Sequence, residues 1–151
     1  MSYAYWDTSC ILKLLQNEKG ASFLQGQLDP ENPVLFSNFG LLEFESVIYR
    51  QHRKSLITIP AILKLESHLM LYLDLRQIVV ISFNNELVSG AIELVKSYGP
   101  TRECQTYDVL HLATAIELQK RGSLAMFVTA DRTLLKLAQD QGLPTIDPET
   151  A

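Results

Sequence analysis

Residues 124–146 read LAMFVTADRTLLKLAQDQGLPTI and contain a strand, a helix and a second strand in succession. Leu124–Val128 is a short apolar run, which is typical of a buried strand. Thr133–Gln139 has apolar residues at helical spacing and is followed by Gly142, a residue type that often lies just past a helix end. Leu143–Ile146 is the candidate for the second strand. Two strands joined through a helix predict a parallel pair, because the crossover returns the second strand in the same direction.

The rest of the chain also consists of strands separated by helices, although the middle departs from strict alternation. We predict three further strands, at Tyr3–Trp6, Val34–Ser37 and Ile78–Ile81. The spacing of apolar residues predicts six further helices, at Thr8–Gln16, Ala21–Leu28, Leu41–His52, Ala61–Leu75, Leu87–Tyr98 and Thr106–Arg121. The third and fourth of these helices follow each other without a strand between them. The sequence therefore predicts an α/β fold: a three-layer α/β/α sandwich around a mainly parallel sheet of four to five strands, with a helical hairpin inserted in the middle.

Length and composition indicate a single domain over residues 1–151. The chain is 47% hydrophobic and 20% charged, which is ordinary for a globular protein, and its apolar runs are much shorter than the ~20 residues of a membrane span. The N-terminus has neither the basic nor the apolar region of a signal peptide, so we expect a cytoplasmic protein with no membrane partner. Cys10 and Cys104 are too few and too isolated for a disulfide framework or a zinc site.

The net charge of −4 is unfavourable for a nucleic-acid enzyme, because phosphate binding favours basic surfaces. It does not exclude one, since bound divalent cations reverse the local field of an acidic site. A basic partner protein would also suit this charge.

Ligands of a parallel sheet bind beyond the carboxyl ends of its strands, and several acidic residues lie near such positions in the predicted fold. Asp7 directly follows the first strand, and Asp131 comes shortly after the strand that ends at Val128. Asp108 lies in the first turn of an apolar helix. Glu43 and Glu45 both lie among apolar residues at the start of another helix, and periodicity does not choose between them.

Carboxylates that share one site repel each other unless a cation compensates them. Oxygen ligands without histidine or cysteine favour magnesium or manganese, and such an ion supports hydrolysis of phosphodiesters. Simpler roles account for the same positions equally well. Asp7 and Asp131 are good helix N-caps, and Asp108 complements a helix dipole. Spacing alone leaves these interpretations open.

Four segments occur in a distinctive order: YWDTS at residues 5–9, FSNFGLLE at 36–43, YDVLHLATA at 107–115 and FVTADRTLL at 127–135. Together they resemble the PIN domain family, and within it the VapC-like toxins of bacterial type II toxin–antitoxin systems. The resemblance covers nearly the whole chain. One departure is Trp6, which occupies a strand position where the family pattern has an aliphatic residue.

The resemblance implies roles for particular residues. Asp7 and Asp108 resemble the principal magnesium ligands of the family. Glu43, rather than Glu45, and Asp131 resemble the remaining members of its acidic cluster. Thr129 resembles a residue that helps to orient the site.

The resemblance also implies an activity and partners. It implies a metal-dependent endoribonuclease that uses Mg²⁺ or Mn²⁺, a homodimer, and inhibition by a cognate antitoxin protein. The alternative is a catalytically inactive PIN-fold module that binds RNA or protein and keeps the acids as a relic. A haloacid-dehalogenase type of phosphotransferase is excluded because Ser9 stands where its second acid is needed, and a receiver domain because Asp7 is not one of a pair.

Four other features have two interpretations each. His111 is either a proton carrier or a buried structural histidine, and Arg102 is either an RNA contact or a solvated loop residue. The basic residues within 50–54 either bind phosphate or simply end a helix, where cations are favoured. The unusually apolar helix at 61–75 either packs in the core or offers a surface to a partner.

Overall fold

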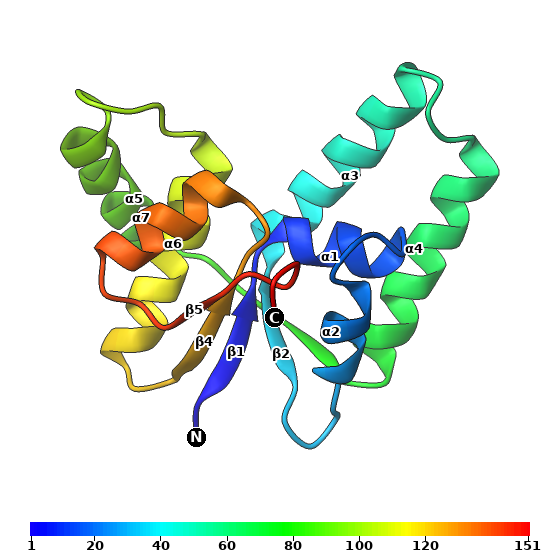
Figure 1. Ribbon diagram of the computed structural model, residues 1–151, viewed down its shortest axis with the longest axis horizontal. Helices are drawn as coiled ribbons and strands as arrows, with labels where there is room; N and C mark the ends of the chain where they lie inside the picture. The colour runs from blue at the N-terminus through cyan, green and yellow to red at the C-terminus, as the bar shows by residue number, and fades with distance from the viewer.

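A five-stranded, wholly parallel sheet forms the middle of this computed structural model, which describes residues 1–151. Across the sheet the strands follow the order β3 (Ile78–Ile81), β2 (Val34–Ser37), β1 (Tyr3–Trp6), β4 (Leu124–Val128) and β5 (Thr145–Ile146). Figure 1 shows the strands rising side by side, with helices on both sides of them. The predicted parallel sheet is confirmed.

The helices divide into two groups, one on each face of the sheet (Figure 1). The first group is α1 (Thr8–Leu15), α2 (Ala21–Gly26), α3 (Asn38–Arg53) and α4 (Ile59–Asp74). The second group is α5 (Asn85–Tyr98), α6 (Thr106–Lys120) and α7 (Arg132–Asp140). The three-layer sandwich is therefore confirmed, as is the helical hairpin, which α3 and α4 form between β2 and β3. None of the seven helices combines the length and the apolar character that a membrane span requires.

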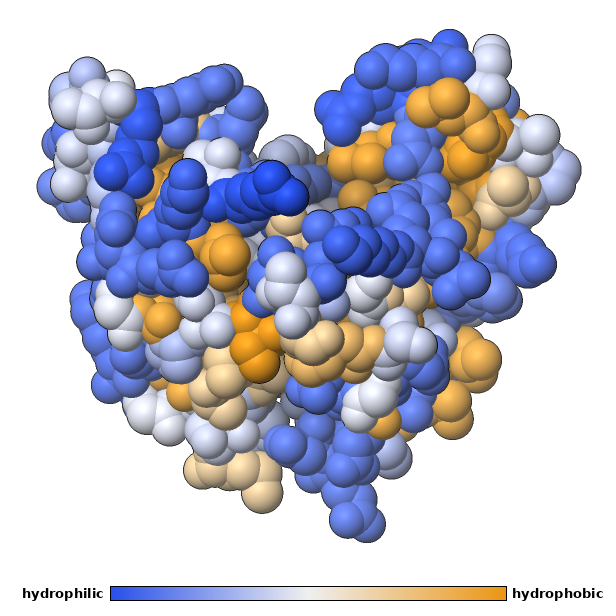
Figure 2. All heavy atoms as spheres, in the orientation of Figure 1, coloured by the Kyte–Doolittle hydropathy of each residue, from blue (hydrophilic) through white to orange (hydrophobic).

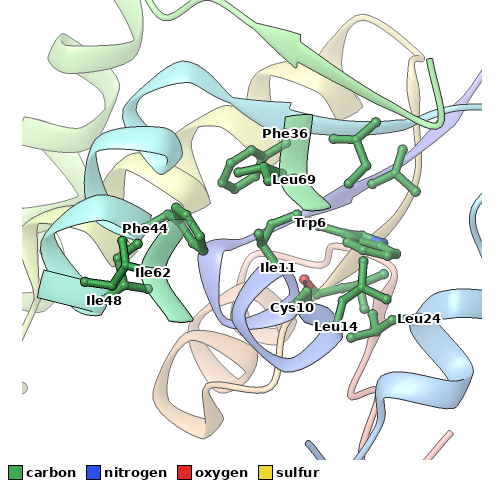
Figure 3. Close-up of a cluster of buried hydrophobic side chains, with 13 residues drawn as sticks. Trp6, Cys10, Ile11, Leu14, Leu24, Phe36, Phe44, Ile48, Ile62 and Leu69 are labelled. Atoms are coloured by element: carbon green, nitrogen blue, oxygen red, sulfur yellow. Dashed lines mark hydrogen bonds between the residues drawn. The ribbon is translucent and has the colours of Figure 1, made fainter. Parts of the chain in front are cut away.

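Alternation along the strands separates the core into two layers, because successive strand residues point to opposite faces. Trp6 and Phe36 pack towards α1–α4, whereas their neighbours Tyr5 and Leu35 pack towards α6 and α7. Figure 3 shows the first layer, in which Trp6 lies among side chains of α1 and α2. Its indole is fully buried.

The observed element ends lie close to the predicted ones. Four strands agree to the residue, and β5 is shorter than the predicted Leu143–Ile146. The largest difference is the start of α3, which begins at Asn38 instead of Leu41. Gly40 discourages a helix prediction there, but it is needed because a Cβ at this position would lie 2.5 Å from the ring of Phe36. The helix predicted at Ala61 begins at Ile59, since the Thr58 hydroxyl caps it.

The connections bring two loops together at one edge of the sheet. From β1 the chain continues to β2 and β3 on one side, and later to β4 and β5 on the other. The carboxyl ends of β1 and β4 are therefore a topological switch point, where open α/β sheets bind ligands. Here the Asp7 amide donates a 3.3 Å hydrogen bond to the carbonyl of Val128.

Candidate active site

A cleft of about 620 Å³ lies between α3 and the first turn of α6. Figure 2 shows a notch between the side of the molecule that carries α5–α7 and the side that carries α3 and α4 (Figure 1), with hydrophilic side chains along much of its rim. Glu43, Asp108 and Asp131 line the cleft, and Asp7, which is only 3% exposed, is close enough to affect the charge of Asp108. The fold thus gathers all four predicted acids from four separate segments.

One face of α3 forms a wall of this cleft. Glu43, Ser46, Val47 and Arg50 line it at the spacing of neighbours on a single helix face. Glu45 does not reach the cleft. Burial, and then the charge of Glu66 on α4, raise the pKa of Glu45. The structure therefore places Glu43 at the candidate site.

Asp7 is held by three donors at the switch point. Its Oδ1 accepts hydrogen bonds from the Ser9 hydroxyl at 2.6 Å and the Cys10 amide at 3.3 Å. Its Oδ2 accepts one from the Thr129 hydroxyl at 2.6 Å. Burial raises the pKa of Asp7, while His111, Ser9 and Thr129 act in the opposite direction. The interpretation of Asp7 as an N-cap of α1 is correct. The same carboxylate also lies close enough to the other acids to influence the charge of Asp108.

The loop after β4 is tied to Asp7 through hydroxyl groups. Ser9 Oγ accepts from the Ala130 amide at 3.1 Å, and Thr129 Oγ1 accepts from the Asp131 amide at 3.1 Å. Asp131 in turn caps α7. No structural role for Ser9 was predicted from the sequence, because its bond to the Ala130 amide joins segments that lie far apart in the chain.

Asp108 is the acid whose ionisation is most affected. It is half-buried, and burial, followed by the charges of Asp131, Asp7 and Glu43, raises the pKa of Asp108 to about 7 from its ordinary value of 3.8. Near neutral pH this carboxyl group is therefore poised between its neutral and charged forms. Repulsion by three neighbouring carboxylates is a property that a bound cation would relieve.

The raised pKa of Asp108 predicts how the stability of the protein depends on pH when no divalent cation is present. Between about pH 4 and pH 7 the folded protein binds the Asp108 proton more tightly than the unfolded chain, so wild-type stability falls as pH rises through this window. Asp108→Asn has no such proton to lose. In urea denaturation at pH 8 we expect the variant to be more stable by about 1–2 kcal/mol, after allowance for solvent screening of a half-buried group. Near pH 4 the advantage should disappear, and an equal difference at both pH values would contradict the assignment.

The chemistry of the donors suits a hard divalent cation. All four candidates offer carboxylate oxygens, and neither cysteine nor histidine lines the cleft. As they stand, however, no three His, Cys, Asp or Glu side chains are close enough together to form a ligand set for a metal ion. The four carboxylates are therefore a loose acidic cluster that suits a cation by charge and donor type.

Other residues singled out in the sequence lie outside the cleft. Arg102 pairs with Asp140 at 3.1 Å and lies over the ring of Tyr98, so it is engaged on the surface. His111 is fully buried. Several apolar side chains of α4 are exposed rather than packed in the core, namely Ile59, Leu63, Met70 and Leu71. Both cysteines are free thiols.

Comparison with known proteins gives a consistent result. A family model for the PIN domain matches residues 4–140. PAE2754 from Pyrobaculum aerophilum shares 18% identity with a TM-score of 0.66, and the match covers 99% of this chain and 91% of that one. VapBC2 from Rickettsia felis, bound to a DNA fragment from its promoter, shares 15% identity with a TM-score of 0.64, covering 95% of this chain and 97% of that one. A toxin–antitoxin complex from Klebsiella pneumoniae shares 16% identity with a TM-score of 0.56, and the match covers 96% of this chain and 97% of that one. At these identities the likeness concerns the fold, and no curated protein matches the sequence.

Proposed function

Since this chain belongs to the PIN domain family, we propose that it is a metal-dependent endoribonuclease that hydrolyses RNA phosphodiester bonds, and the toxin of a toxin–antitoxin pair. The observation that carries the proposal is the cleft lined by Glu43, Asp108 and Asp131, with the buried Asp7 close enough to influence the charge of Asp108. A cluster of carboxylates at a topological switch point has the charge and the location that metal-assisted hydrolysis requires.

Asp7, Asp108, Glu43 and Asp131 would hold Mg²⁺ or Mn²⁺. When bound, such an ion supplies an activated water and neutralises charge that develops on the phosphodiester. The protein's own contribution is to hold the acids in place. Asp7 is fixed by the Ser9 and Thr129 hydroxyls, and Asp131 by its cap on α7.

The experiment that tests this proposal is cleavage of total cellular RNA by the purified protein. Parallel reactions contain Mg²⁺, Mn²⁺ or EDTA. Defined fragments that appear only with the metal would support the nuclease, and their ends would identify the cleaved RNA. The absence of fragments in every metal, or equal cleavage in EDTA, would overturn it.

The second candidate is a PIN-fold module that binds RNA or protein without cleaving it. One observation favours it: no three of the candidate ligands converge closely enough to form a preformed metal site. Such a module would retain its binding in EDTA and after replacement of the acids. Binding lost together with the metal would favour the nuclease instead.

A cognate antitoxin is proposed as the protein partner. The likeness to a toxin–antitoxin complex from Klebsiella pneumoniae supports it, within the limits of a shared fold. A second groove of about 590 Å³ runs between α1 and the α3–α4 hairpin and is half apolar, with Leu15, Leu56 and Leu65 in its wall. The exposed apolar side chains of α4 lie on the same hairpin. An extended or helical segment of a partner would cover this apolar area.

Arg50 is the candidate contact for the RNA backbone. It is the one cation that lines the acidic cleft, and it forms no salt bridge. We expect Arg50→Ala to raise KM for RNA by roughly 3–10-fold and to leave kcat unchanged. Because the variant makes about one phosphate contact fewer, its KM should also depend less steeply on salt concentration. Arg53→Ala removes the same charge from the same helix outside the cleft and is the matched control. An unchanged KM in Arg50→Ala would contradict this role.

A homodimer is proposed through α5. Val88, Ile92 and Val95 lie on one face of this helix, and each is more than a third exposed. All three line an apolar groove of about 420 Å³, which also includes Phe83. We expect Ile92→Asp to weaken the dimer by about 100-fold or more, because burying an unpaired carboxylate is strongly unfavourable. Light scattering after size-exclusion chromatography measures this, with Glu93→Ala as the control that should remain dimeric.

A further inference from the structure

His111 is a fully buried polar side chain that contacts Glu43, a residue that lines the acidic cleft. It lies on α6, one turn after Asp108. Its Nε2 is 2.9 Å from Oε1 of Glu43 and 3.2 Å from the hydroxyl of Thr8. Its Nδ1 is 2.7 Å from the hydroxyl of the equally buried Tyr5. One imidazole therefore connects β1, α1 and α3 to the helix that carries Asp108.

The partners of the ring decide where its hydrogen lies. The Thr8 hydroxyl donates to the carbonyl of Gly40 at 3.5 Å, so its oxygen accepts from His111. An ionised Glu43 carboxylate can only accept. Nε2 therefore carries a hydrogen, and in the neutral ring Nδ1 accepts from the Tyr5 hydroxyl. In this arrangement each ring nitrogen has a partner of the opposite kind.

Glu43 depends on this contact for its orientation. Its side chain is 20% exposed, and its one hydrogen bond comes from His111. A glutamate side chain has three rotatable bonds, so an unanchored carboxylate on α3 would sample several positions. The bond engages Oε1 and leaves Oε2 without a hydrogen-bond partner, on a residue that lines the cleft. The imidazole is itself immobile, since Tyr5 fixes Nδ1 and the ring of Phe39 packs at a centroid distance of 4.8 Å.

We propose that His111 is a positioning residue that directs the Glu43 carboxylate into the cleft and so sets the affinity of the site for a divalent cation. This inference rests on the proposed metal-dependent function. Partners that orient ligands in this way typically change metal affinity or activity by about 10–100-fold when they are removed. A histidine that served packing alone would have no such effect.

Two substitutions separate positioning from packing. The amide nitrogen of glutamine at position 111 takes the place of Nε2 and can still donate to Glu43. Asparagine reaches only to the place of Nδ1 and keeps a partner for Tyr5 but not for Glu43. We expect His111→Asn to raise the Kd for Mn²⁺ by about 10–100-fold, measured by calorimetry, and His111→Gln to recover most of the affinity. Leu112→Ala is the packing control, because this neighbour is fully buried and apolar.

Each outcome bears on the proposal. Mn²⁺ affinity that is unchanged in His111→Asn, or lowered equally in Asn, Gln and Leu112→Ala, would overturn it. If the His111 variants do not fold, Tyr5→Phe takes their place. It removes only the hydroxyl that fixes Nδ1, and it should weaken Mn²⁺ binding several-fold in the wild-type background but not in Glu43→Gln, while an equal effect in both would overturn the proposal. A protein that binds Mn²⁺ with this pattern but cleaves no RNA would refute the nuclease and leave the positioning role standing, whereas a wild type that binds no Mn²⁺ would refute both.

Discussion

Replacing Asp108 with asparagine should lower the rate of metal-dependent RNA cleavage by roughly 10²–10³-fold. Asp108 is the acid that is most strongly influenced by the other three, since Asp131, Asp7 and Glu43 all contribute to its raised pKa. Asparagine keeps the size of the side chain but removes the negative charge that a cation requires. Because relief of repulsion also favours the folded state, the variant should lose activity without losing stability.

The measurement compares initial rates of cleavage in Mn²⁺ for wild type, Asp108→Asn and a matched control. Asp140→Asn is that control, because it makes the same change of charge at an exposed position on α7 outside the cleft. It should cleave RNA at nearly the wild-type rate. Activity retained in Asp108→Asn would mean that the acidic cleft is not the catalytic centre.

The sheet could be predicted because its signal is local. Four strands are short apolar runs bounded by helices or turns, and their bounds agree with the structure to the residue. The start of α3 could not be predicted in the same way. Gly40 has a low helix propensity, and its place in the helix depends on the ring of Phe36, which arrives from the preceding strand. Tertiary packing overrides propensity at this point.

The acidic site was partly predictable for a topological reason. Residues that follow β1 and β4 must meet at one edge of a parallel sheet, which brings Asp7 and Asp131 together from opposite ends of the chain. The choice between Glu43 and Glu45 did not follow from periodicity. Phe44 between them is buried, so the two glutamates flank the buried stripe of α3 on opposite sides. The family resemblance implied Glu43, and in the structure the two are distinguished by α4, which lies beside Glu45, and by α6, which lies beside Glu43.

The contacts of His111 and Arg50 could not be predicted from the sequence either. Both depend on how the α3–α4 hairpin stands relative to α6, and no local pattern specifies that arrangement. The simpler interpretation of Asp7 shows a different limit, because capping and membership of the acidic cluster turn out to be compatible. A helix N-terminus attracts a carboxylate, and the same carboxylate then contributes to the charge of the cleft.

Replacing Trp6 with alanine should lower the free energy of unfolding by about 3–5 kcal/mol, because the largest side chain of the buried core would leave a cavity. Such a loss is a large part of the stability of a typical domain, about 5–15 kcal/mol. Trp6→Phe is the control. It keeps an aromatic ring in place and removes the indole N–H, which has no hydrogen-bond partner. The free energy of unfolding should therefore fall by less than about 1.5 kcal/mol in Trp6→Phe.

Urea denaturation of the two variants measures this difference, and cleavage assays at a temperature where both are folded measure its consequence. Trp6 points into the layer under α1 and α2, whereas the adjoining Asp7 is held by the hydroxyls of Ser9 and Thr129. We therefore expect Trp6→Phe to keep its metal-dependent activity and Trp6→Ala to lose stability first. A loss below 1 kcal/mol in Trp6→Ala would contradict the packing of this core layer. Cleavage abolished in a folded Trp6→Phe protein would mean that the indole, and not the hydroxyl contacts alone, fixes Asp7.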